Sequence, residues 1–191
     1  MPAPGGEYRV AYAAALLRRG GVIAHATEGV WGLACRASEE QAVWRILAIK
    51  RRSWRKGLIL VPDSALPCAP LLASLPEQTR AVMLRSWPGP TTWLVPHLQQ
   101  VPHWITGRSS RVALRVTAHP QFAALCRRVG GPVVSTSANR GGAAPVRSAR
   151  AARQVFGGQI NAVLQGELGG AAGPSAILDA LTGEPVRALP A

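Results

Sequence analysis

Apolar positions along the chain follow helical spacing and strand spacing in turn. A helical stripe over residues 10–17 ends at a glycine pair, and the apolar strand Val22–His25 follows it directly. A second helical stripe begins at the sequence S-E-E-Q, residues 38–41, which has the form of a capping box, and it reaches Lys50. Residues 57–61, G-L-I-L-V, are typical of a further strand. The first third of the chain is therefore predicted to alternate helix and strand.

The same alternation continues to the end of the chain. Proline suits the first position of a helix, and the Pro-Gly-Pro sequence at residues 88–90 forces a turn. Together these patterns predict one α/β domain, residues 8–191, with a mixed, open sheet, preceded by a loose tail at residues 1–7. The remaining helices are expected at 76–87, 120–129 and 149–156, the strands at 91–95, 112–116, 162–164, 176–179 and 185–189, and loops at 62–76 and 99–107.

Hydroxyl and amide side chains gather where a buried strand must stop, in P-V-V-S-T-S-A-N at residues 132–139. The two valines end the strand, and in an extended backbone Ser135, Ser137 and Asn139 point one way while Thr136 points the other. Ligands of open α/β sheets bind beyond the carboxyl ends of strands, where such groups converge. A turn that caps itself is the alternative interpretation.

Two further segments carry polar side chains at the end of a strand. Thr27 and Glu28 follow the strand Val22–His25 in the same way. Arg115 projects from the predicted strand 112–116, and an arginine inside a sheet requires an anion or a position at the edge. These residues join the candidates for a binding site.

The second helix ends in a basic segment, K-R-R-S-W-R-K, residues 50–56. Cations in a last helical turn stabilise the helix dipole, which accounts for Lys50 but not for Arg55 and Lys56. Lys50 and Arg52 point to the same side only if the helix ends there and the chain leaves extended. The pattern favours a phosphate-binding role over a purely structural one.

Composition adds a strong positive charge. The chain has 22 Lys and Arg against 9 Asp and Glu, a net charge of +13, which favours anionic ligands or polyanionic partners unless it reflects a general basic bias. Only Lys50 and Lys56 are lysines. Three scattered cysteines, no signal-peptide pattern and no long apolar run indicate a cytoplasmic protein with reduced thiols and no membrane span.

Several segments, in their order and spacing from Tyr8 to Arg187, resemble the YrdC/Sua5 family in its short, single-domain bacterial form. The family's K-x-R and S-x-N signature falls on Lys50, Arg52, Ser137 and Asn139. The segments that carry the resemblance are H-A-T-E-G-V-W-G-L-A-C, K-R-R-S-W-R-K-G-L-I-L, W-P-G-P-T-T-W-L-V-P, V-A-L-R-V and S-T-S-A-N.

The resemblance implies a twisted sheet with a large, basic, concave cavity and threonylcarbamoyl-AMP synthase activity. L-threonine, bicarbonate and ATP, the last with Mg²⁺, would give threonylcarbamoyl-adenylate and pyrophosphate. The product would serve t6A formation at position 37 of tRNAs that read codons beginning with A, with downstream threonylcarbamoyl-transferase proteins as partners and tRNA as a possible one. The resemblance places ATP at Lys50, Arg52, Lys56, Ser137, Asn139, Arg147 and Ser175, threonine at Thr27, Arg115, Ser135 and Thr136, and catalysis at Lys50 and Arg52, with no metal-binding residue identified.

The sequence also departs from the family pattern. His25-Ala26 replaces Tyr-Pro, Ser53 replaces a proline, and Leu178 replaces an arginine. Lost prolines loosen the turns around the substrates. Two alternatives stay open at this point: a non-catalytic module that binds tRNA or double-stranded RNA on the same fold, and a paralogue that uses another amino acid or carbamoyl donor.

Overall fold

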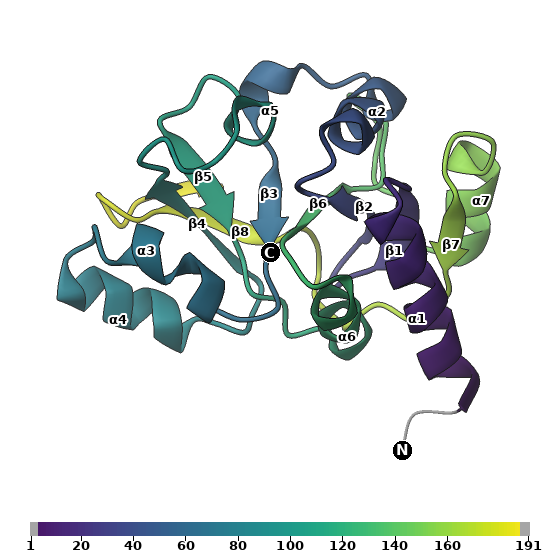
Figure 1. The fold of residues 1–191 in the computed structure, drawn as a ribbon, viewed down its shortest axis with the longest axis horizontal. Helices are drawn as coiled ribbons and strands as arrows, with labels where there is room; N and C mark the ends of the chain where they lie inside the picture. The colour runs from purple at the N-terminus through teal and green to yellow at the C-terminus, as the bar shows by residue number, and fades with distance from the viewer. Residues whose placement is uncertain (1–3, 188–191) are drawn as a thin grey trace.

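The computed structural model describes residues 4–187, and their strands form one mixed sheet (Figure 1). The strand order is β7-β1-β2-β6-β3-β5-β4-β8-β9. Three neighbouring pairs are parallel, β1 with β7, β3 with β5 and β4 with β8, and the other five are antiparallel. The strands are β1 (Ile23–Ala26), β2 (Trp31–Arg36), β3 (Ile59–Val61), β4 (Thr91–Pro96), β5 (Arg111–Leu114), β6 (Val133–Ser137), β7 (Ala162–Leu164), β8 (Ala176–Asp179) and β9 (Pro185–Arg187).

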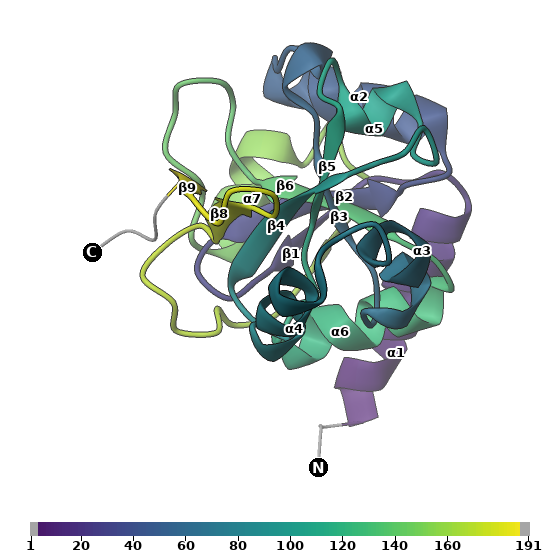
Figure 2. The ribbon, with the colours of Figure 1, turned by 90° about the vertical axis from the view of Figure 1, so that its left-hand side faces the viewer.

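Helices cover both faces of this sheet. Helices α1 and α6 lie side by side against one face, below the strands in both views (Figures 1 and 2). Helices α2 and α7 pack on the other face at β2 and β1, and α5 and α3 contact β5 and β4. The helices are α1 (Pro4–Arg18), α2 (Glu40–Lys50), α3 (Ala69–Leu72), α4 (Glu77–Arg85), α5 (His103–Thr106), α6 (Pro120–Val129) and α7 (Ala149–Phe156), with short 3-10 turns η1 (Trp54–Lys56) and η2 (Leu66–Cys68).

Alternate residues of the central strands divide the core into two clusters. Val133 and Ala34 belong to the cluster beneath α1 and α6, whereas their neighbours Val134 and Leu33 belong to the cluster on the opposite face. Successive side chains of a strand point to opposite faces of the sheet. A strand that is apolar at every position therefore contributes to the core on both faces. The predicted α/β class with a mixed, open sheet is confirmed.

The structure corrects four details of the predicted elements. Helix α1 begins at Pro4, so residues 4–7 are helical rather than a loose tail. The strand Trp31–Arg36 was missed. Its residues are buried on both faces, with Gly32 among them, and therefore lack the alternation that marks a half-buried strand. The predicted loops at 62–76 and 99–107 contain the short helices η2, α3 and α5.

The predicted capping box at the start of α2 is wrong. Glu39, not Ser38, holds the N-cap position, and no side chain caps the helix. Ser38 lies one residue too early for its hydroxyl to reach the free amides of the first turn. The last residues of the predicted strand 185–189 lie outside the described part of the chain. No helix among residues 4–187 is long and apolar enough to cross a membrane.

Packing between α1 and α6 should supply a large share of the stability. Leu125 on α6 is fully buried, whereas Leu84 on α4 is 43% exposed. Replacing Leu125 by Ala removes buried apolar area and leaves a cavity, so we expect the free energy of unfolding to fall by about 2–5 kcal/mol in urea denaturation. The same substitution at Leu84 is the matched control and should cost less than about 1 kcal/mol. Equal losses at the two positions would contradict this packing.

Candidate active site

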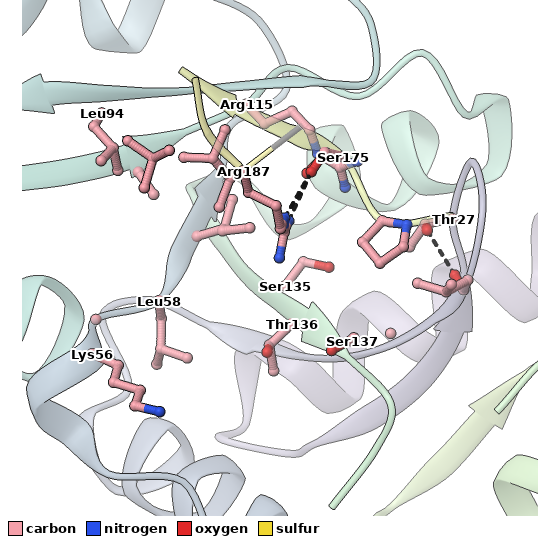
Figure 3. A pocket seen from close by; sticks show the side chains of 18 of the residues that line it. Thr27, Lys56, Leu58, Leu94, Arg115, Ser135, Thr136, Ser137, Ser175 and Arg187 are labelled. Atoms are coloured by element: carbon pink, nitrogen blue, oxygen red, sulfur yellow. Dashed lines mark hydrogen bonds between the residues drawn. The ribbon is translucent and has the colours of Figure 1, made fainter. Parts of the chain in front are cut away.

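A cavity of about 280 Å³ lies against the sheet, and Figure 3 shows side chains that line it. Ser135 lies two residues after the buried Val133 on β6, so both side chains point to the same face of the sheet. Helices α1 and α6 cover this face at Val133, and the cavity lies on it at Ser135. The residues of the floor come from six neighbouring strands, and the pairing of these strands places them side by side. The floor residues are Gly32, Ser135, Ser137, Ile59, Ala113, Leu94 and Ile177.

The walls of the cavity are strongly cationic. Glu28 is the one carboxylate among the described residues that line it. A cleft lined mainly by cations attracts anions. The lining cations are Arg52, Lys56, Arg111, Arg115 and Arg187.

Glu28 connects the turn after β1 to the end of β5. Its carboxylate accepts hydrogen bonds from Arg115 Nη1 at 3.0 Å, from the Thr117 hydroxyl at 2.6 Å and from the backbone N–H of Ala118 at 3.0 Å. Burial opposes the charge, but Arg115 and these hydrogen bonds prevail and hold the pKa of Glu28 below its ordinary value. Of the two expectations for Arg115, an anion or a position at the sheet edge, the structure shows an anion, Glu28. Arg115 Nε is buried without a hydrogen-bond partner.

A glycine-rich segment, residues 168–174, reaches the cavity by binding the same turn. Gly169 N–H donates to Thr27 O at 3.0 Å and Ala171 N–H donates to Glu28 O at 2.9 Å. The two backbones approach so closely that a Cβ at Gly29 would lie 2.1 Å from the carbonyl oxygen of Gly173. Only glycine fits at position 29, and this contact brings Ser175 to the cavity wall.

Arg187 lines the cavity but was absent from the sequence-based candidates. Its guanidinium donates twice to Ser175 O, at 3.1 and 2.8 Å (Figure 3). Burial lowers the pKa of Arg187, and Arg115 and Arg52 lower it further, so three guanidinium groups repel one another around one space. No sequence pattern marks this arginine as a site residue, because it reaches the cavity only through the pairing of β9 with β8.

Lys50 and Asn139 meet behind the cavity wall. Helix α2 ends at Lys50 because Arg51 adopts a left-handed conformation, with φ 50°. Lys50 Nζ then donates to Asn139 O at 2.9 Å, to Asn139 Oδ1 at 3.0 Å and to Ser137 O. Burial, with Arg52 nearby, lowers the pKa of Lys50 to about 8. The two signature segments therefore meet at Lys50 and Asn139, and the roles assigned to these residues stay predictions.

The structure brings most of the predicted site residues to one cavity. Strand β6 continues through Ser137 rather than ending at the valines, so its hydroxyls belong to the sheet itself. Figure 3 shows Ser135 and Thr136 on opposite sides of β6, as the sequence predicted. Lys50, Asn139 and the exposed Arg147 do not line the cavity. The predicted residues that do are Thr27, Arg52, Lys56, Arg115, Ser135, Thr136, Ser137 and Ser175.

A resident metal ion does not fit this set of residues. No three His, Cys, Asp or Glu side chains of residues 4–187 lie close enough to hold a metal ion. The carboxylate of Glu28 is already bound by Arg115, Thr117 and Ala118. A divalent cation at this site would therefore have to enter with a ligand that carries its own oxygen donors.

His25 lies at the boundary between the cavity and the apolar core. The centroid of its ring lies 4.1 Å from that of the Phe122 ring, and its Nε2 lies 3.3 Å from the Ser135 hydroxyl oxygen. Burial is the main reason that the pKa of His25 falls to about 3, with smaller contributions from His119 and Arg115. His25 is therefore neutral at physiological pH. Its importance was not evident from the sequence, where it was only a departure from a family pattern.

The buried His25 should make stability depend on pH. Between pH 7 and pH 5 the unfolded chain binds a proton at this imidazole that the folded chain does not, so stability is lost as pH falls. We expect this residue to lower the free energy of unfolding by about 2 kcal/mol over that range. His25→Gln cannot titrate and should flatten the slope, measured by urea unfolding at several pH values.

His103→Gln, at an exposed position, is the matched control for the change of residue type. The two slopes are compared with that of the unmodified protein. An unchanged slope in His25→Gln would show that His25 does not resist protonation in the folded state.

Sequence comparisons identify relatives over almost the whole chain. The Sua5/YciO/YrdC family model, whose description is "Telomere recombination", matches residues 15–189. A threonylcarbamoyl-AMP synthase of Cellvibrio japonicus is 50% identical over 179 residues, which cover 94% of this chain and 95% of that protein. A protein of the same name from Coxiella burnetii is 45% identical over 171 residues, 90% of this chain and 92% of its own.

Structural comparison agrees with the sequence relatives. Sua5 of P. abyssi, in a crystal structure with L-threonine, has a TM-score of 0.83 and 33% identity over 91% of this chain. The match covers 51% of that protein, so this chain spans about half its length. E. coli YciO, at 21% identity and a TM-score of 0.82, covers 96% of this chain and 89% of its own and shows likeness of fold alone. The predicted resemblance is confirmed, and the chain belongs to the Sua5/YciO/YrdC family.

Proposed function

We infer that this chain is a threonylcarbamoyl-AMP synthase, which forms threonylcarbamoyl-adenylate and pyrophosphate from L-threonine, bicarbonate and ATP. The observation that carries the inference is the cavity itself, where several cations face a row of hydroxyls at the centre of the sheet. Relatives that share about half of its residues carry that enzyme name. They favour an enzyme over the non-catalytic RNA-binding module.

The phosphates of ATP would lie against Arg52, Lys56 and Arg187. The amine of threonine and bicarbonate first form a carbamate with loss of water. An oxygen of the carbamate then attacks the α-phosphorus, the bond to the β-phosphate oxygen breaks, and negative charge shifts onto the departing pyrophosphate. Guanidinium and ammonium groups already placed around the phosphates stabilise such charge. Arg52 donates Nη2 to Gly57 O at 2.9 Å, which fixes its plane, while its buried Nε has no partner in the described residues.

Threonine would be bound by Thr27, Arg115 and Ser135, and Thr136, on the other side of β6, stays a further candidate for it. Arg115 uses Nη1 to bind Glu28, and no hydrogen bond within the described residues occupies its Nη2, so the guanidinium retains a donor for the substrate carboxylate. Glu28 fixes the position of this group before a ligand arrives. Preformed geometry of this kind lowers the entropic part of the activation free energy, by up to roughly several kcal/mol.

The other predicted residues have supporting or outer positions in the proposal. Lys50 and Asn139 hold the end of β6 and act on ATP through Ser137, rather than by direct contact with phosphate. The carbonyl oxygen of Ser175 accepts a hydrogen bond from Arg187, and the Ser175 hydroxyl lies 2.9 Å from that of Thr92. Arg147 stays a candidate for ATP from the exposed segment before α7.

The remaining components belong to the same proposal. Mg²⁺ would enter as the counterion of ATP, because the phosphates supply the oxygen ligands that the cavity lacks. The product would pass to proteins that transfer the threonylcarbamoyl group to tRNA for t6A formation. The high positive charge favours direct contact with tRNA as well.

Pyrophosphate release should depend on threonine. With ATP, Mg²⁺ and bicarbonate, the purified protein should release pyrophosphate on addition of L-threonine and only at background level without it, as measured by a coupled phosphate assay. Serine and other amino acids are the controls for a paralogue with a different substrate. Release that does not depend on an amino acid, or no release at all, would overturn the proposed function.

Removing a phosphate-facing cation should impair catalysis. Arg52→Ala should lower kcat/KM by about 10²-fold, and Arg187→Ala should raise the KM for ATP by roughly tenfold, because charge on the phosphates is then uncompensated. Arg153→Ala on α7 removes an exposed arginine outside the cavity and controls for the change in net charge. Steady-state kinetics with ATP varied would decide. Three variants of equal activity would exclude both assigned roles.

A further inference from the structure

The hydroxyl proton of Ser135 has a fixed direction. His25 Nδ1 lies 2.9 Å from the carbonyl oxygen of Ala26, which can only accept, so Nδ1 carries the imidazole proton. The buried ring is neutral, and its Nε2 is therefore a bare acceptor. Ser135 must donate its proton to Nε2, across 3.3 Å.

The proton of Ser137 is fixed in the same way by different partners. Lys50 Nζ has only donors, so the Asn139 atom 3.0 Å from it must be the carbonyl oxygen Oδ1. The amide nitrogen on the other side donates to Ala143 O at 2.8 Å, which agrees with that orientation. Ser137 lies 2.6 Å from Oδ1 and must donate to it.

A third hydroxyl at the cavity follows the pattern. Thr27 donates its proton to the carbonyl oxygen of Val30 at 2.6 Å. Each of these three hydroxyls has a single proton, and each uses it within the protein. What remains on Thr27, Ser135 and Ser137 for a ligand in the cavity is the oxygen lone pairs.

We propose that His25 and the Lys50–Asn139 pair are positioning residues that make Ser135 and Ser137 hydrogen-bond acceptors toward the cavity, so that β6 selects ligand groups that donate. The proposal rests on the function inferred above. Within that reaction, the α-amine of threonine and the ribose hydroxyls are donors, whereas the carboxylate and the phosphates accept. The donor groups therefore bind at Ser135 and Ser137 of β6, and the anionic groups bind at the arginines that line the cavity.

This division of polarity explains how a cationic cavity can hold an amine at all. Among the described residues, five cations and one carboxylate line the space, and that carboxylate, Glu28, is already bound on both oxygens. An amine there needs acceptors, and a buried donor left without one costs roughly 1–3 kcal/mol. A freely rotating serine could turn its proton toward the amine, and the internal partners of Ser135 and Ser137 prevent that rotation.

Enzyme kinetics on His25 variants test the proposal. His25→Leu removes the acceptor for the Ser135 proton, so we expect the KM for threonine to rise about five- to tenfold while the KM for ATP changes less than twofold. His25→Gln places an amide oxygen near the position of Nε2 and should restore most of the loss. In a Ser135→Ala background, His25→Leu should have less than a twofold further effect, because His25 acts through that hydroxyl.

A second double-mutant cycle tests whether Lys50 acts through Ser137. Lys50→Met keeps most of the length of the side chain but removes its donors, and its effect on the KM values should shrink at least severalfold in a Ser137→Ala background. Arg52→Met is the matched control, since it removes a cation of the same segment that faces the cavity, and its effect should persist in that background. Independent effects of Lys50 and Ser137, or an equal rise of both KM values in His25→Leu, would overturn the proposal.

A spectroscopic measurement is independent of activity and of variants that fold poorly. In the unmodified protein labelled with ¹⁵N-histidine, long-range ¹H–¹⁵N spectra should show His25 protonated at Nδ1 and bare at Nε2 from pH 8 to pH 5. A proton on Nε2, or titration of His25 near pH 6.5, would overturn the acceptor assignment. Lack of threonine-dependent pyrophosphate release would instead overturn the proposed function, and the spectrum would still decide the state of His25.

Discussion

The site depends on one buried carboxylate in a protein rich in arginine. Glu28 joins the turn after β1 to Arg115, Thr117 and Ala118 beyond β5. Its own backbone carbonyl holds Ala171 of the glycine-rich segment, which leads to Ser175. Without this negative charge, Arg115 would be a buried cation without a partner, and three segments distant in sequence would lose their common contact.

A single sheet face serves as both core and binding surface. Strand β6 is apolar where α1 and α6 cover it, at Val133, and polar two residues later, at Ser135. His25 and Phe122 lie at the change, with the imidazole facing a phenyl ring on one side and a hydroxyl on the other. The rigid sheet thus carries the hydroxyls of the site directly, and their positions follow from strand pairing rather than from loop conformation.

Local patterns predicted much of the fold and of the cavity lining. Helices such as Pro120–Val129 and Ala149–Phe156 follow from helical spacing and their caps, and β7 and β8 have the predicted bounds. The pattern failed at Trp31–Arg36, where burial on both faces removes the alternation that identifies a strand. It also failed to place Arg187, which reaches the cavity through a hairpin held at the far edge of the sheet.

The sequence by itself determined the α/β class, the family, and the polar segments at strands that line the cavity, because helix periodicity, strand burial and motif spacing are local properties. Tertiary structure decided what each polar group does. Lys50 is directed to Asn139 rather than to the cavity, Arg115 to Glu28, and the Ser135 proton to His25. Hydrogen bonds and charges act between atoms a few ångströms apart, and those neighbours come from residues that are far apart in the chain.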